Sequence, residues 1–179
     1  PIRVLIFGGS QGASIFSKVP PAVIEKLPAE IRARLDIVQQ AREAEAEEVR
    51  ARYAKAGVKA EVAPFFTDLP QRIANAHLVI GRAGASTVTE IGVIGRPSIL
   101  VPLAIAMDDH QTGNARVLAD AGAAAIIAEK EFTEETLRDA LSPLLSNPAR
   151  LAEMARAARG RIRHGASQTL ADLIEGVAT

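Results

Sequence analysis

Short apolar runs alternate with longer, more polar segments along the whole chain. Six such runs, each four to six residues long and rich in Val, Ile, Leu and Ala, lie at 2–7, 35–39, 58–63, 77–81, 98–101 and 123–127. Most show little alternation of apolar and polar residues, which is typical of strands buried on both faces of a parallel sheet. Helices are expected at 12–27, 42–56, 67–76, 87–94 and 108–121, with two or three more after residue 127. This order predicts an α/β fold, a Rossmann-like doubly wound parallel sheet of about six strands with C-terminal helices.

Glycine and proline mark the expected ends of these elements. Gly57, Gly95 and Gly122 stand where helices should stop, because glycine readily adopts the left-handed conformation that follows a helix. The pair Pro20-Pro21 should break or kink the first helix. Asn147 and Pro148 should begin a late helix, with Asn as N-cap and Pro at the first helical position.

The composition narrows the function classes. Lys and Arg number 21 and Asp and Glu also 21, so no overall positive field attracts nucleic acid or an anionic membrane. The absence of cysteine excludes a disulfide framework, a thiol nucleophile and a cysteine-ligated zinc site. No apolar run reaches the roughly 20 residues that cross a bilayer. We expect residues 1–179 to form a single domain, and the strand-like start at Pro1 without Met suggests a piece of a longer protein.

The loops that follow the strands are the places to look for a ligand, because parallel sheets bind ligands at the carboxyl ends of their strands. The loop at 8–13 has three glycines and leads into a helix whose N-terminal N–H groups would attract a phosphate. Its alternative interpretation is a tight turn with Ser10 as N-cap. The loop does not match the dinucleotide pattern G-x-G-x-x-G.

The loop at 81–87 is a second junction of small residues between a strand and a helix. Thr87 and Glu90 have the spacing of a capping box, in which both side chains serve the helix end. Alternatively, Glu90 accepts hydrogen bonds from a sugar or ribose diol, as carboxylates do in nucleotide sites.

Five polar residues open the helix expected at 108–121. Asp108 could cap this helix with Gln111 as its partner, but His110 and Gln111 are also placed to contact a ligand. Adjacent carboxylates alone are a poor ligand set, so we expect no metal site. The loop at 64–68 holds Phe66, which could lie against a base or pack in the core.

Four blocks of sequence, in this order, resemble the C-terminal half of the MurG family of bacterial glycosyltransferases. They are GGSQGA at 8–13, GRAGASTVTEI at 81–91, GRPSILVPL at 95–103 and DDHQTGNARVLADAGAA at 108–124. That family transfers N-acetylglucosamine (GlcNAc) from UDP-GlcNAc to lipid I and forms lipid II for peptidoglycan. The resemblance implies one half of a two-domain GT-B enzyme, with UDP-GlcNAc bound by this half and lipid I by an N-terminal acceptor domain absent from this chain.

The resemblance also implies roles for single residues, and it requires no cofactor. Contacts with the UDP phosphates and the nearby sugar would come from Ser10, Gln11, Gly12, Ala85, Ser86 and Thr87. Glu90 would hold the ribose hydroxyls, and the backbone around Phe66 would read uracil. His110 and Gln111 would meet the GlcNAc hydroxyls, although the family often has Gln at position 110. A family arginine that helps to bind the diphosphate would lie before residue 1.

The family inverts the anomeric carbon, and its catalytic base is expected in the missing domain. The resemblance therefore implies that this chain binds donor, transfers no sugar alone and is soluble. The full-length protein would be peripheral on the cytoplasmic face of the inner membrane, held mainly through the other domain. Alternative interpretations are a non-catalytic donor-binding subunit of a split GlcNAc transferase, another UDP-sugar glycolipid transferase, and an epimerase or unrelated Rossmann binder.

Overall fold

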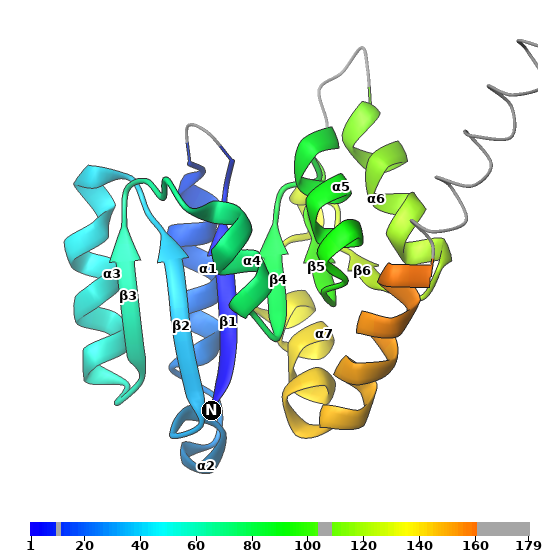
Figure 1. Ribbon diagram of the computed structural model, residues 1–179. Helices are drawn as coiled ribbons and strands as arrows, with labels where there is room; N and C mark the ends of the chain where they lie inside the picture. Colours follow the sequence, from blue (N-terminus) through cyan, green and yellow to red (C-terminus); the bar gives the residue numbers. More distant parts are fainter. Residues whose placement is uncertain (10–11, 104–108, 161–179) are drawn as a thin grey trace, which may run out of the picture.

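The computed structural model describes residues 1–9, 12–103 and 109–160. Six parallel strands form one sheet in the order β3-β2-β1-β4-β5-β6 (Figure 1). Their bounds are β1 Ile2–Phe7, β2 Leu35–Gln40, β3 Lys59–Ala63, β4 Leu78–Gly81, β5 Ser98–Leu100 and β6 Ala124–Ile126. The predicted fold class is confirmed, and each expected strand lies within about a residue of its predicted bounds.

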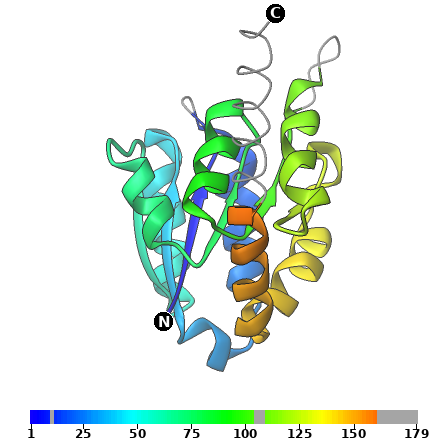
Figure 2. The ribbon, with the colours of Figure 1, turned by 45° about the vertical axis from the view of Figure 1, so that its right-hand side comes forward.

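Helices cover both faces of the sheet (Figure 2). One apolar core lies under α1 (Ser14–Ile24), α3 (Glu43–Lys55) and α7 (Glu134–Ser146). The opposite core lies under α4 (Leu69–Asn75), α5 (Ala85–Ile94) and α6 (His110–Asp120). The short elements α2 (Ala29–Arg32) and η1 (Glu129–Glu131) complete the order.

The chain ends its described part in a helix at 148–160, drawn in orange in Figure 1. Its predicted start is confirmed, because Asn147 Oδ1 accepts a hydrogen bond from the Arg150 amide at 3.3 Å and Pro148 occupies the first helical position. Met154 packs into one core and Ala158 into the other, so this helix packs against both layers near the amino ends of the strands.

The expected break at Pro20-Pro21 is wrong, because both prolines lie inside α1. Pro20 has no N–H to donate to the carbonyl of Phe16 one turn earlier. Gln39, on β2, replaces that donor, since its Nε2 lies 2.7 Å from the Phe16 oxygen. The buried Tyr53 hydroxyl in turn donates to Gln39 Oε1 at 2.5 Å. The Gln39 side chain of β2 therefore supplies the hydrogen bond to α1 that Pro20 cannot donate.

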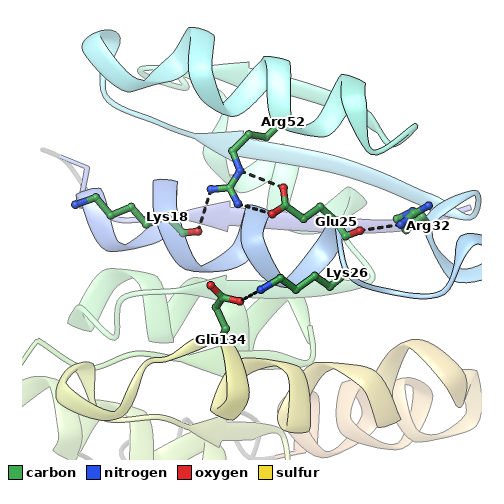
Figure 3. A network of polar contacts seen from close by, with 6 residues as sticks. All are labelled: Lys18, Glu25, Lys26, Arg32, Arg52 and Glu134. Atoms are coloured by element: carbon green, nitrogen blue, oxygen red, sulfur yellow. Dashed lines mark hydrogen bonds and ion pairs between the residues drawn. The ribbon is translucent and has the colours of Figure 1, made fainter.

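An ion-pair network fixes α1 against the helices beside it (Figure 3). Arg52 of α3 donates to both oxygens of Glu25, with its Nη2 at 2.7 Å from Oε1. This hydrogen bond is the main reason why the pKa of Glu25 lies below its usual value. Arg32 bonds the Glu25 carbonyl at 2.7 Å, and Lys26 pairs with Glu134 of α7. Arg52 of the 42–56 helix therefore helps to hold α1 in place.

Replacing Gln39 with Leu should destabilise the protein by about 2–4 kcal/mol, because it leaves the Phe16 carbonyl and the Tyr53 hydroxyl buried without partners. Urea unfolding followed by circular dichroism measures the change. Tyr53→Phe is the matched control and should cost about 1 kcal/mol, since Gln39 keeps its bond to α1. A Gln39→Leu variant as stable as wild type would contradict this role.

Candidate functional site

The site lies between β1 and β4, where the strand order reverses direction. The chain leaves β1 towards one face and β4 towards the other, so a crevice opens at their carboxyl ends. Phe7 and Gly81 are paired at these ends. A Cβ on Gly81 would stand 2.7 Å from the Phe7 carbonyl oxygen, so this approach of the two strands needs glycine.

A cleft of about 740 Å³ occupies this crevice. It is lined by Gly8, Gly9, Gly12, Ala13, Ser14, Ile15, Arg42, Arg82, Gly84, Ser86, Thr87, Leu103, Gln111 and Glu129. The loops after β1, β4 and β5 thus meet around one cleft, as their place at the strand ends predicted.

The β1–α1 junction brings the first turn of α1 to this cleft. Gly9 and Gly12 have φ of +91° and +66°, and a Cβ on Gly8 would stand 2.6 Å from the Ala13 nitrogen. The N-cap of α1 is Ala13, which makes no side-chain cap, and its first turn holds no acidic residue. Ser10 as N-cap is therefore wrong, and the start of α1 is left suited to an anion. Ser10 and Gln11 lie outside the described residues.

The β4–α5 junction lines the same cleft as the β1–α1 junction, opposite to it. Helix α5 begins at Ala85, with Gly84 as an N-cap that makes no side-chain bond. Thr87 is therefore in the first turn of α5, and the predicted capping box is wrong. Ser86 and Thr87 line the cleft, whereas Ala85 does not. Glu90 lies one turn further along, half-buried and outside the lining.

The start of α6 is held to this rim by amide side chains. Gln111 Oε1 accepts hydrogen bonds from the amides of Leu103 at 2.9 Å and Ala83 at 3.4 Å. Asn114 Nδ2 donates to the Ala83 carbonyl at 3.0 Å. Gln111 thus joins the loops after β4 and β5 while it lines the cleft.

The expected cap at the start of α6 is displaced by one residue. Asp109 is the N-cap and accepts from the Thr112 amide at 3.2 Å, and Asp108 lies outside the described residues. The expected pairing of Asp108 with Gln111 as a cap is therefore wrong. His110 is the exposed first residue of α6 and is not part of the lining.

A second cavity of about 250 Å³ adjoins the cleft and shares Gly9, Ser86 and Thr87 with it. Phe66 lines this cavity, and the Arg72 guanidinium lies 4.1 Å from the centre of its ring. The remaining lining comes from Phe7, Gln40, Phe65 and Leu69. Gln40 joins the two loops here, since it accepts from Gly8 at 3.0 Å and donates to Pro64 at 3.3 Å. An aromatic pocket therefore lies next to the two helix starts.

Three charged residues, Arg42, Arg82 and Glu129, also line the cleft, and no role was predicted for them from the sequence. Arg82 is 8% exposed, and its Nη2 lies 2.7 Å from Glu129 Oε1. Its Nη1 donates to the Val101 carbonyl at 3.3 Å, and the guanidinium lies 5.3 Å from the ring centre of Phe16. Arg82 thus joins the loops after β4 and β5 to η1 and α1 at the cleft. Arg82 follows β4 and Glu129 follows β6, so the rule that ligands bind beyond the carboxyl ends of strands would have pointed to both residues.

Within residues 1–9, 12–103 and 109–160, no group of three or more His, Asp or Glu side chains lies close enough together to hold a metal ion. Across the same part of the chain, every helix is too short or too polar to cross a bilayer.

The chain is similar to known proteins in both sequence and fold. The model of the glycosyltransferase family 28 C-terminal domain matches residues 3–175. The UDP-N-acetylglucosamine–N-acetylmuramyl-(pentapeptide) pyrophosphoryl-undecaprenol N-acetylglucosamine transferase of Caulobacter vibrioides is 51% identical over 99% of this chain and 49% of its own length. The protein of the same name from Chelativorans is 53% identical over 99% of this chain and 47% of its own.

A solved structure also matches closely. The crystal structure of Acinetobacter baumannii MurG has a TM-score of 0.82 and 39% identity, over 98% of this chain and 52% of that one. The chain therefore spans about half the length of the curated relatives it matches.

The Arg82–Glu129 pair should show an interaction energy of about 1–2 kcal/mol in a double-mutant cycle of Arg82→Met and Glu129→Gln. The reason is that Arg82 is buried and its charge would be left without a partner. Urea unfolding of the four proteins measures it. The exposed Arg138–Asp139 pair is the control and should give less than about 0.5 kcal/mol. Equal energies for both pairs would show that Arg82 does not organise the floor of the cleft.

Proposed function

The chain belongs to the family of glycosyltransferase family 28 C-terminal domains, and on this basis we propose that it is the donor-binding domain of an inverting glycosyltransferase. The full-length enzyme moves GlcNAc from UDP-GlcNAc to lipid I and forms lipid II for peptidoglycan. The observation that carries the proposal is the convergence of two helix starts without side-chain caps on one cleft, beside an aromatic pocket.

The donor lies across the cleft with its diphosphate between the starts of α1 and α5. Both helix ends offer backbone N–H groups and the positive end of a helix dipole, and neither has an acidic residue in its first turn. Uracil enters the adjoining cavity beside Phe66, and Glu90 takes the ribose hydroxyls. GlcNAc lies towards the start of α6. The proposed donor contacts are Ser10, Gln11, Gly12, Phe66, Ala85, Ser86, Thr87, Glu90, His110 and Gln111.

In the proposed reaction, the starts of α1 and α5 stabilise the leaving group, UDP. The acceptor hydroxyl attacks the anomeric carbon and passes its proton to a base, while the bond from that carbon to the phosphate oxygen breaks with inversion. Negative charge then grows on UDP, and fixed N–H groups stabilise it without having to reorganise. No metal or cofactor is part of this proposal.

The other half of the relatives' length supplies the rest of the reaction in this proposal. We place the lipid I site, the base and the contact with the cytoplasmic face of the inner membrane in an N-terminal domain. Relatives about 50% identical and twice as long support a one-chain enzyme over a split, non-catalytic subunit. The chain of 179 residues should therefore bind donor without transferring sugar.

Isothermal titration calorimetry should detect UDP and UDP-GlcNAc binding to the 179-residue chain at about millimolar concentration or below. UDP-galactose should bind more weakly if the rim near Gln111 selects GlcNAc. A transfer assay with lipid I should give no product. Absence of UDP binding at millimolar concentration would contradict the site, and turnover by this chain would contradict the proposed division of labour.

Glu90→Ala should cost about 1–3 kcal/mol of UDP affinity, because the ribose hydroxyls lose their acceptor. The melting temperature should not change, since Gly84 and not Thr87 is the N-cap of α5. The control is Glu153→Ala, which removes an exposed carboxylate paired with Arg150 and should leave UDP affinity unaltered. Unchanged UDP affinity in Glu90→Ala would remove Glu90 from the site.

A further inference from the structure

Arg42 stands at the cleft although no sequence motif marks it. It follows β2 as the N-cap residue of α3, is exposed, and lines the cleft. Its Nη1 donates a hydrogen bond to Ser14 Oγ at 3.0 Å. Because Ser14 is the first residue of α1, this bond places the guanidinium at the helix start that faces the cleft.

The β1–α1 loop is shaped to admit the arginine side chain. Gly12 has a φ of +66°, and a Cβ there would lie 3.3 Å from Arg42 Cγ. A larger residue at position 12 would be strained and would press on the stem of Arg42. The arginine and the glycine-containing loop therefore form one packed unit at the edge of the cleft.

Ser14 is itself oriented by Glu45 of α3. Ser17 Oγ donates to Glu45 Oε2 at 2.8 Å, and hydrogen bonds from Ser14 and Ser17 hold the pKa of Glu45 below its usual range. The ionised Glu45 accepts a hydrogen bond from the Ser14 hydroxyl, so a lone pair of the Ser14 oxygen is left to accept from Arg42. Arg42 thus donates to a hydroxyl, and its positive charge also helps to lower the pKa of the nearby Glu45.

The charges of the cleft leave Arg42 available to an anion. Among the described lining residues, Arg42, Arg82 and Glu129 are charged. Arg82 is buried and paired with Glu129 at 2.7 Å, whereas none of the ion pairs of the described residues includes Arg42. A guanidinium has five N–H donors in a plane that suits phosphate oxygens, and the bond to Ser14 uses one of them.

We infer that Arg42 is a phosphate-binding residue that selects a nucleoside diphosphate over the bare nucleoside. This inference rests on the proposed function, because it assigns Arg42 to the diphosphate of the same donor. The cation reaches the phosphates from the β2–α3 junction, beside the N–H groups that begin α1. A bound diphosphate would gain a charge-assisted contact that uridine cannot make.

Calorimetric titration of wild type and Arg42→Gln with UDP and with uridine tests the inference. UDP affinity should fall about tenfold, as expected for the loss of one charged hydrogen bond, and uridine affinity by less than about twofold. Lys55→Gln is the matched control: it removes one positive charge from the same helix, roughly 20 Å away by helical rise, and should alter neither affinity. Arg42→Lys keeps the charge and should retain UDP binding within about threefold.

Equal weakening of UDP and uridine in Arg42→Gln would assign Arg42 a structural role and overturn the inference. Unchanged UDP affinity in Arg42→Gln would also overturn the inference about Arg42. In that case UDP binding by the wild type would still support the proposed function. Failure of wild type to bind UDP would overturn both. The effect of Arg42→Gln should shrink between about 50 and 500 mM salt, because an exposed charge is screened.

Discussion

The close approach of β1 and β4 at their carboxyl ends is the constraint on which the candidate site depends. Phe7 and Gly81 meet there, and the missing side chain of Gly81 lets the Phe7 carbonyl oxygen lie 2.7 Å from where a Cβ would stand. Because the chain order reverses at this pair, α1 and α5 leave towards opposite faces of the sheet. Their starts therefore face one another across a cleft, and one anion can be met by both.

Neutral amide side chains hold the loops at the rim of this cleft. The charged residues of the cleft lie at other positions. Gln40 joins the loops after β1 and β3, while Gln111 joins those after β4 and β5. These bonds fix the loops without bringing a carboxylate to the helix starts. Arg82 is neutralised by Glu129 below the cleft, and Arg42 adds a positive charge at its edge. The arrangement suits a ligand with negative charge at its centre and a flat ring at one end.

The sequence was sufficient for the sheet and for the loops that meet at its rim, because both follow from the period of apolar residues and the strand-end rule. It failed where a distant contact decides the local structure. Pro20 lies inside a helix because Gln39 supplies the missing donor, and Gln111 has the spacing of a capping partner but bonds other loops. Arg42 and Arg82 looked like ordinary charges, because a sequence does not show which carboxylates fold beside them. The predicted contacts at Ser10 and Gln11 lie outside the described residues.

Amide chemical shifts of the ¹⁵N-labelled chain during a UDP titration test the central claim most directly. If one diphosphate spans both helix starts, the resonances of Gly9, Gly12, Ser86 and Thr87 shift together and saturate at one UDP concentration. Shifts confined to one of the two junctions would contradict the account. So would shifts at the opposite end of the strands, around His77.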